Sequence, residues 1–315
     1  MIEIKNVVKK YGNFVVLEDG NLSIATGSTF GLVGINGAGK STLLRMLAGI
    51  FSADSGSICI NGEPVFDNKK IKKDILFLPD EPFYNSLSNG EQVAEIYKTF
   101  YSFNNNTFLN YTTAYNLDLK APLRSYSKGM KKRLFVSLAF ASNPKYLFLD
   151  EVFDGIDPAA RLIFKNGLAQ LKSTANTTVV MASHSLRDLA DICDSFSLID
   201  GKKIRATKTI SSTSNELTKL RIAFLKPATK EHFSNIKYLY FETTGNIATI
   251  IFKGSKESFI KNINNLNLKP FVIDELSIDF EEYFLSEECN TGRAYENADI
   301  GDNFREHTNS CISIW

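Results

Sequence analysis

The residues best suited to chemistry lie in one glycine-rich stretch, residues 31–42, with the sequence GLVGINGAGKST. Gly34, Gly39, Lys40 and Ser41 form the pattern G-x-x-x-x-G-K-S within it. Glycines leave backbone N–H groups free to line a concave anion site, and they tolerate a left-handed backbone. The lysine can reach the β and γ phosphates, and the serine hydroxyl can bind Mg²⁺. This stretch therefore predicts a P-loop for a nucleoside triphosphate and its metal.

Two acids further along the chain could complete a hydrolytic site. The apolar run 146–149 ends in Asp150, whose carboxylate could hold Mg²⁺ through water. Glu151 follows at once and could polarise an attacking water, although acid pairs are also common in ordinary loops after strands. His184 follows another apolar run and could reach the terminal phosphate or be purely structural. Tyr11, on an early turn, could equally stack on a base or pack on the surface.

These residues need secondary structure that brings them together. Residues 42–48 predict a helix whose N-terminal dipole faces the anion. Short apolar runs predict buried strands at 28–33, 75–78, 146–149 and 177–182. Because helical segments alternate with these runs, the sequence indicates an α/β fold with a mainly parallel sheet covered on both faces.

Two further regions have a different character. Residues 1–26 alternate apolar and polar side chains, which predicts strands with one exposed face. Residues 87–141 are rich in Phe and Tyr and predict a separate helical subdomain. There, Ser88 and Glu91 have the spacing of a capping box, which predicts a helix from that point to about Tyr101. A later helix is expected over 131–141.

Composition limits the classes of protein that fit. The chain has 315 residues, is 43% hydrophobic and carries a net charge of +1, so its charge gives no case for nucleic acid as a partner. Residues 1–5 lack the apolar core of a signal peptide, and no run approaches the roughly 18 apolar residues of a spanning helix. Four scattered cysteines and three histidines lack metal-ligand spacing, which favours a reduced, cytoplasmic protein whose metal arrives with phosphate.

The composition changes near a polar run at 211–215, which indicates a linker. We therefore predict a nucleotide-binding domain over 1–212 and a small α+β accessory domain over 213–286. Residues 287–315 hold few apolar side chains and an excess of acids, which predicts a disordered tail.

Over about its first 210 residues, the chain resembles the ATP-binding subunit of ABC transporters. The stretch 34–42 matches Walker A, and 146–151 matches Walker B with the catalytic glutamate. Residues 126–130, YSKGM, are similar to the signature loop in the form common among ABC-2 type exporters. Residues 154–157 resemble the D-loop, His184 fits the switch histidine, and Tyr11 fits the aromatic residue that stacks on adenine.

The resemblance implies a P-loop NTPase fold with an antiparallel β subdomain and a helical subdomain. It also implies ATP hydrolysis, with ATP and Mg²⁺ bound. Glu151 and His184 would be catalytic, and Mg²⁺ would be held by Ser41, Asp80 and Asp150. The nucleotide would be bound by Tyr11, Asn36, Gly37, Ala38, Gly39, Lys40, Ser41, Thr42, Ser127 and Gly129.

Several positions depart from the family pattern. Asp80 stands where the family usually has a glutamine, so a carboxylate replaces an amide near the metal. Lys128 and Met130 replace a glycine and a glutamine of the common signature, while Ser127 and Gly129 remain. Val152 replaces a proline that commonly follows the glutamate. We interpret these as subfamily features that affect the rate of hydrolysis.

The family's signature loop contacts a phosphate held by the opposite subunit, so the resemblance implies a head-to-tail dimer around two ATP molecules. The dimer could be formed by two identical chains or with a related ATPase. It would drive a separate ABC-2 type transmembrane permease from the inner face of the membrane, as an exporter. Phe83, Tyr84 and Leu87 would contact the permease, or else pack the helical subdomain.

Two other functions fit the cassette. One is a soluble ABC ATPase that acts on ribosomes or DNA, although such relatives usually carry two cassettes or a long coiled coil. The other is a regulator that binds nucleotide but hardly hydrolyses it, against which Glu151 and His184 argue.

Overall fold

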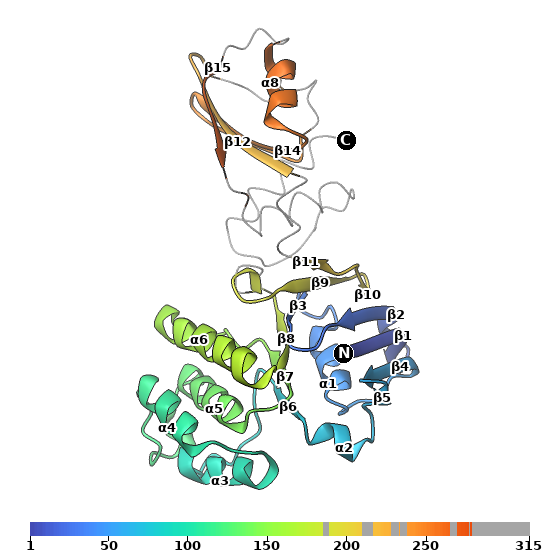
Figure 1. Cartoon of the computed structure of the whole chain (residues 1–315), viewed down its shortest axis with the longest axis vertical. Helices are drawn as coiled ribbons and strands as arrows, with labels where there is room; N and C mark the ends of the chain where they lie inside the picture. The colour runs from blue at the N-terminus through green and yellow to red at the C-terminus, as the bar shows by residue number, and fades with distance from the viewer. Residues whose placement is uncertain are drawn as a thin grey trace. The chain divides into compact units, whose positions relative to one another are not determined.

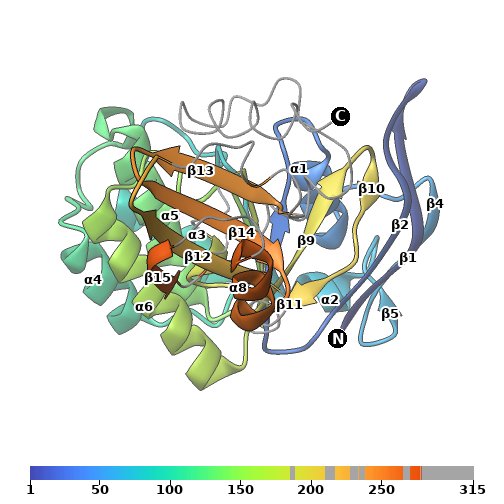
Figure 2. The same ribbon diagram turned by 90° about the horizontal axis from the view of Figure 1, so that it is seen from above.

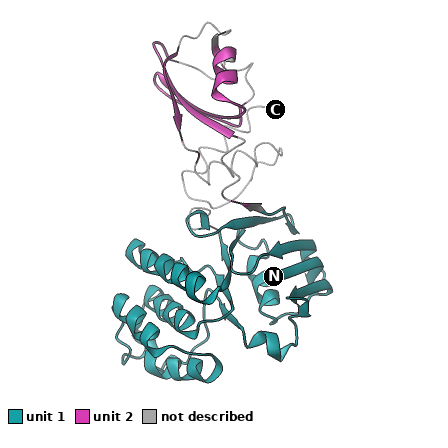
Figure 3. Cartoon of the chain, viewed as in Figure 1, with its two compact units in different colours: residues 1–208 teal, residues 209–315 magenta. Residues whose placement is uncertain are grey.

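The chain divides into two compact units, residues 1–208 and 209–315 (Figure 3). The structure is a computed structural model that describes residues 1–184, 189–209, 217–227, 233, 238–264, 270–276 and 278. The predicted linker at 211–215 and the predicted tail at 287–315 lie outside the described residues. Among the described residues, no helix is long and apolar enough to cross a membrane.

A mainly parallel sheet forms the centre of the first unit, with the order β10-β9-β3-β8-β7-β6. Its strands are β3 (Thr29–Val33), β6 (Ile75–Leu78), β7 (Tyr146–Asp150), β8 (Thr178–Ser183), β9 (Ser195–Asp200) and β10 (Lys203–Ile204). All pairs are parallel except β9 with β10. Strands β3, β7 and β8 are buried along their whole length, as expected for a sheet covered on both faces.

A second, antiparallel sheet has the order β2-β1-β4-β5. It consists of β1 (Ile2–Tyr11), β2 (Phe14–Ile24), β4 (Ser55–Ile60) and β5 (Glu63–Pro64). Helix α1 (Lys40–Leu47) lies between this sheet and the central one (Figures 1 and 2). Its residues Leu43, Leu44 and Leu47 are fully buried in a core that both sheets share. The core therefore fixes the N-terminal end of α1 at the edge of the central sheet.

The opposite side of the central sheet is covered by helices (Figures 1 and 2). They are α5 (Lys128–Ser142) and α6 (Pro158–Ala175), and α3 (Gly90–Phe100) and α4 (Asn105–Ala114) pack on α5. A 3₁₀ turn η1 (Leu123–Ser125) precedes α5, and a short helix α2 (Lys69–Lys72) lies elsewhere. Phe140 of α5 packs on Phe164 of α6, with ring centroids 5.6 Å apart. The described structure thus contains the predicted helical region, and α5 reaches the sheet edge with its N-terminus.

The starts of α3 and α5 differ from prediction, and α1 also begins two residues earlier than predicted, at Lys40. The capping box of α3 is made by Asn89 and Gln92, one residue later than the predicted pair of Ser88 and Glu91. The backbone of Ser88 is engaged elsewhere, because its carbonyl accepts a hydrogen bond from Leu123 N at 2.8 Å. Helix α5 starts at Lys128 instead of at residue 131, since the Ser127 hydroxyl caps it by accepting from a backbone N–H.

The second unit is a small α+β structure with the sheet order β13-β14-β12-β15. Its described elements are β12 (Leu217–Phe224), β13 (Tyr240–Thr244), β14 (Ile247–Lys253), α8 (Lys256–Asn264) and β15 (Pro270–Leu276). The short strand β11 (Lys208–Thr209) before them pairs with β9 of the central sheet. One face of the second unit's sheet packs on α8, where Phe252 stacks on Phe259 with centroids 4.6 Å apart.

Candidate active site

The P-loop joins the carboxyl end of β3 to the first turn of α1, and each of its glycines has a distinct physical reason. Gly37 and Gly39 have φ angles of 83° and 106°, in the left-handed region that favours glycine. At Gly34, a Cβ atom would lie 2.7 Å from the carbonyl oxygen of Ile199 in β9. Asn36 and Gly37 are exposed, whereas Lys40 is buried. The loop therefore offers an open backbone at its tip and a fixed base.

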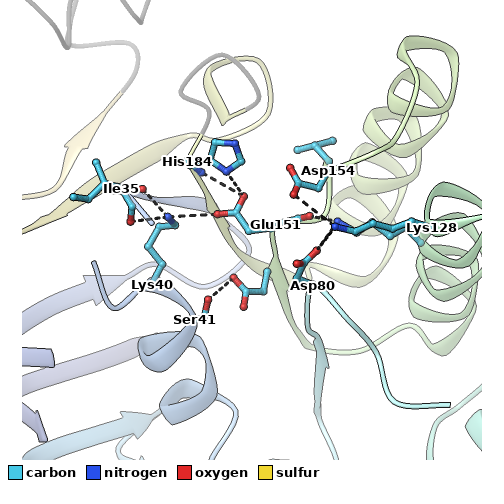
Figure 4. A network of polar contacts seen from close by, with 12 residues as sticks. Ile35, Lys40, Ser41, Asp80, Lys128, Glu151, Asp154 and His184 are labelled. Atoms are coloured by element: carbon cyan, nitrogen blue, oxygen red, sulfur yellow. Dashed lines mark hydrogen bonds and ion pairs between the residues drawn. The ribbon is translucent and has the colours of Figure 1, made fainter. Parts of the chain in front are cut away.

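Lys40 places its ammonium group inside this loop (Figure 4). Its Nζ atom donates to the carbonyl oxygens of Gly34 and Ile35, at 2.6 and 3.2 Å. The same atom lies 3.4 Å from Oε1 of Glu151, and the lysine side chain is only 5% exposed. The buried ammonium group is thus held at the loop by two carbonyls and one carboxylate, and a phosphate could replace these partners.

Asp150 ends β7 beside the first turn of α1. Its side chain is buried, and its Oδ1 accepts a hydrogen bond from the Ser41 hydroxyl at 3.1 Å. Burial raises the pKa of Asp150, and this effect outweighs the lowering by the Ser41 hydrogen bond. A carboxylate and a hydroxyl next to a phosphate loop are hard oxygen donors of the kind that Mg²⁺ accepts, so the donor set fits this ion.

Glu151 contacts residues from three other segments of the chain (Figure 4). Its Oε1 faces Lys40, and its Oε2 lies 2.9 Å from Nδ1 of His184 and accepts from the His184 backbone N–H at 3.4 Å. Its own backbone N–H donates to the carbonyl of Ala182 at 3.0 Å, and its carbonyl accepts from Lys132 Nζ at 2.5 Å. The residue has a φ of 44°, which is costly for a residue with a side chain. These contacts hold it in that conformation.

The structure thus brings five of the predicted site residues into one cluster at the carboxyl edge of the sheet. They are Lys40, Ser41, Asp150, Glu151 and His184. The polar contacts that join them are drawn in Figure 4. Carboxyl edges of parallel strands are where ligands bind in open α/β sheets.

Ser127 and Gly129 lie outside this cluster, at the N-terminus of α5. The Ser127 hydroxyl accepts from Met130 N at 3.2 Å, within its own helical turn. A Cβ atom at residue 129 would lie 2.5 Å from the carbonyl oxygen of Gly155, so glycine is required here by packing alone. The turn is a capped helix N-terminus, which favours anions, pressed against the loop 154–157.

Asp80 follows β6 and faces lysines instead of the Ser41–Asp150 pair (Figure 4). Its Oδ1 lies 2.8 Å from Lys132 Nζ and 3.7 Å from Lys128 Nζ. Lys132 was not predicted from sequence. The only signal was its place four residues after Lys128 on α5, and a helix lysine is usually a solvated surface residue.

Tyr11 ends β1 with its side chain about half exposed, at 46%. Its ring and that of Phe51 pack in a T-shaped arrangement, with centroids 6.2 Å apart, and Lys9 Nζ lies 5.5 Å from the centre of the Tyr11 ring. The ring is therefore supported from one side and retains surface on which a base could stack.

Comparison with known proteins gives consistent matches. A family model described as "ABC transporter" matches residues 17–154. The ABC transporter ATP-binding protein YtrB of Bacillus subtilis is 30% identical over 294 residues, which cover 91% of this chain and 97% of that protein. The lantibiotic transport ATP-binding protein SrtF of Streptococcus pyogenes is 31% identical, covering 72% of this chain and 99% of the relative. The methionine import ATP-binding protein MetN of Clostridium acetobutylicum is 31% identical, covering 89% and 86%.

A solved structure with the same fold is a dimeric ATP-binding cassette in a post-hydrolysis state, bound to ADP and Pi. It superposes with a TM-score of 0.60 at 21% identity and covers 67% of this chain and 99% of that chain. At this identity the likeness shows the fold alone.

Proposed function

The chain belongs to the ABC transporter family, as an ATP-binding subunit with ATPase activity, and on that premise we propose that it powers an exporter. Two copies, or one copy and a related ATPase, enclose two MgATP molecules and drive a separate ABC-2 type permease. The observation that carries this proposal is the cluster of Lys40, Ser41, Asp150, Glu151 and His184 at one sheet edge. It supplies phosphate binding, a metal site and a base within one small volume.

Each group of residues in the site has its own role in binding MgATP. The backbone of residues 36–42 cradles the phosphates, and Tyr11 stacks on the adenine. Lys40 neutralises the β and γ phosphates, and Ser41 with Asp150 would hold Mg²⁺. Asp80, which the sequence predicts as a further ligand, is paired with Lys132 in this structure. When bound, Mg²⁺ would stabilise charge on the transferring phosphoryl group.

Glu151 is the base that polarises the attacking water. In the present arrangement its carboxylate is shared between Lys40 and His184. A triphosphate is the stronger anion for Lys40, so its binding would release one carboxylate oxygen of Glu151 toward water. His184 keeps the other oxygen in place and can reach the γ phosphate from the end of β8.

The proposed dimer is head-to-tail. The capped N-terminus of α5, with Ser127 and Gly129, is an anion site that does not belong to the Lys40 cluster of its own chain. A second copy could present it to the terminal phosphate on this chain's P-loop. Hydrolysis would then remove the shared phosphate and open the dimer.

A complementation experiment tests this arrangement. Lys40→Ala removes phosphate binding from one chain. Ser127→Asp in another keeps a good N-cap for α5 but places a negative charge against the phosphate. Each variant alone should hydrolyse ATP poorly, whereas an equal mixture should recover activity well above the sum of the separate rates, because mixed dimers contain one intact site.

The control is a mixture of two differently tagged Lys40→Ala chains, which contains no intact site in any pairing. If the Lys40→Ala and Ser127→Asp mixture gives only the sum of its separate rates, then the two residues do not meet across a dimer, and the chain is left as a nucleotide-binding subunit of another design.

The permease surface is proposed around the loop after Asp80. Phe83 is 98% exposed and Leu87 is 67% exposed, whereas the ring of Tyr84 packs on Phe135 with centroids 6.1 Å apart. Tyr84 therefore anchors the loop, and we propose that the exposed side chains of Phe83 and Leu87 make the apolar contacts with the permease. We assign export on the form of residues 126–130 and on the likeness to the lantibiotic transport relative.

Membrane association tests the partner. When the chain is co-expressed with its permease, it should be recovered in the membrane fraction, bound to the cytoplasmic side of the membrane. The double variant Phe83→Ser, Leu87→Ser should no longer bind the membrane. Phe14→Ser, a change of another exposed phenylalanine on β2, is the matched control. Sedimentation of the chain with ribosomes instead of membranes would contradict the transporter assignment and favour a soluble ABC ATPase.

A further inference from the structure

Lys132 joins three segments that carry the chemistry of the site. Its Nζ atom lies 2.5 Å from the carbonyl oxygen of Glu151 and 2.8 Å from Oδ1 of Asp80, and its side chain is only 5% exposed. We propose that Lys132 is a positioning residue for hydrolysis, which fixes Glu151 through its backbone and is itself held by Asp80. The proposal rests on the role of Glu151 as base given above.

The burial of this lysine requires a counter-charge. A cation removed from water is stable only when it is paired and its donors are satisfied. Asp80 supplies the carboxylate, and the Glu151 carbonyl accepts a hydrogen bond. Lys128, one helical turn earlier, is 55% exposed and lies farther from Asp80, at 3.7 Å. The carboxylate at position 80, where the family usually has an amide, thus has a physical reason in this chain.

The contact to Glu151 matters because that residue is strained. Its φ of 44° is unfavourable for a side-chain-bearing residue, so the conformation persists only while its surroundings hold it. On one side, the Glu151 N–H is bound by the Ala182 carbonyl of β8 at 3.0 Å. On the other side, its carbonyl accepts from Lys132 Nζ at 2.5 Å and from the Asp154 backbone N–H at the longer distance of 3.3 Å. Without Lys132, only the longer of these two hydrogen bonds remains, and the direction of the Glu151 carboxylate is held less firmly.

The same contacts give a route for control. Asp80 stands three residues before Phe83, in the loop proposed to meet the permease. A shift of this loop would pull Asp80 from Lys132, and the buried ammonium would then lose its counter-charge and move from the Glu151 carbonyl. Lys128 makes a longer ion pair with the loop that follows Glu151, since its Nζ atom lies 3.9 Å from Oδ2 of Asp154. Permease contact would therefore change hydrolysis without touching the nucleotide.

The test separates positioning from binding. Lys132→Met should lower kcat about tenfold to a hundredfold, the range expected for losing a charged hydrogen bond at a reacting group. The KM for ATP and the equilibrium affinity should stay within about twofold, because Lys132 makes no contact with the P-loop among the described contacts. Lys132→Gln keeps a donor for the Glu151 carbonyl without the charge, so it should recover part of kcat.

The chain offers a matched control at the other end of the same two strands. Lys145, just before β7, pairs with Asp74, just before β6, at 2.9 Å, but this lysine is 69% exposed. Lys145→Met removes the same kind of ion pair far from Glu151 and should change kcat by less than about twofold. Thermal unfolding of all variants identifies any loss of fold, and Lys132→Gln keeps the test valid if Lys132→Met does not fold.

A double-mutant cycle tests the link to Asp80. If the two residues act as one unit, Asp80→Asn with Lys132→Met should be no slower than Lys132→Met alone. The proposal is overturned if Lys132→Met keeps the parent kcat, if kcat and affinity fall together, or if the two losses multiply. Should Glu151→Gln itself hydrolyse ATP at the parent rate, the proposed role of Glu151 fails, whatever Lys132 does.

Discussion

Two parts of the site are built in opposite ways. The P-loop is local: Lys40 is held by the carbonyls of Gly34 and Ile35, six and five residues before it. The surroundings of Glu151 are assembled from distant segments, since Lys132 lies 19 residues away and His184 lies 33 residues away. One is a continuous turn between a strand and a helix, and the other exists only when α5, β7 and β8 are all in place.

This difference separates binding from hydrolysis. A loop that closes on itself can bind phosphate with little help from the rest of the fold. A base that depends on three other elements responds to any movement of those elements. On the proposed mechanism, the chain would keep ATP bound while its partners control when hydrolysis occurs. Variants in the two regions should reveal this separation.

The largest effect is expected at the assembled region. Glu151→Gln removes the base but keeps the size of the side chain, so hydrolysis should fall by about a hundredfold to ten-thousandfold. Binding should persist, and the variant should accumulate as an ATP-bound dimer that is seen by sedimentation. Steady-state ATPase at the parent rate would show that another group activates water. His184→Gln, which alters a partner of Glu151, provides the comparison within the same cluster.

In the local region, Lys40→Ala should lower the affinity for ATP. It removes a charge-assisted contact to phosphate, so equilibrium binding by calorimetry should weaken by about tenfold to a hundredfold. The variant should fail to form the nucleotide-dependent dimer. Affinity equal to that of the parent would mean that backbone N–H groups alone bind the phosphates. Lys145→Met again serves as the matched lysine control.

Asp150 lies between the P-loop and Glu151. Its replacement by asparagine should raise the stability of the fold and lower the ATPase activity. Burial raises the pKa of Asp150, so the folded protein binds more protons than the unfolded chain at pH values between the ordinary carboxyl pKa and the raised one. The free energy of unfolding therefore falls as the pH rises through this window, and above it the full cost of the buried charge remains.

Asp150→Asn removes that charge, so it should raise the free energy of unfolding by about 1 kcal/mol at pH 8 without nucleotide. The gain should shrink as the pH falls toward the ordinary carboxyl range, and Mg²⁺-dependent ATPase should be lost. Urea titrations at several pH values measure the first effect. A variant less stable than the parent at pH 8 would show that the Ser41 hydrogen bond outweighs the burial cost.

The smallest effects should distinguish two glycines of the P-loop. Gly37→Ala meets no atom within 4 Å but has a φ of 83°, so it should cost about 1 kcal/mol in backbone strain. Gly34→Ala would place Cβ 2.7 Å from a carbonyl oxygen of β9, which should cost about 1–3 kcal/mol. Urea denaturation measures both. An equal or larger loss at Gly37 would mean that the loop does not depend on its contact with β9.

The buried strands and the phosphate loop were accessible from sequence because their signals are local. The strand predicted at 75–78 is β6 as observed, and the other buried strands differ by a residue or so at their ends. Helix starts were less accurate. The capping-box spacing fits two overlapping pairs, and the hydrogen bond from Leu123 to Ser88 selects the later one.

The sequence by itself determined that this chain binds a triphosphate, because glycine, lysine and serine at fixed spacing are a local signal of a phosphate loop. It also placed acids after strands whose carboxyl ends must share an edge. Only the tertiary structure decided how Glu151 is held, which of two exposed-looking lysines is buried, and that Gly129 faces the carbonyl of Gly155. The physical reason is that burial of a charge and close packing of backbones arise between segments far apart in the chain. Neither can therefore be predicted from the local sequence.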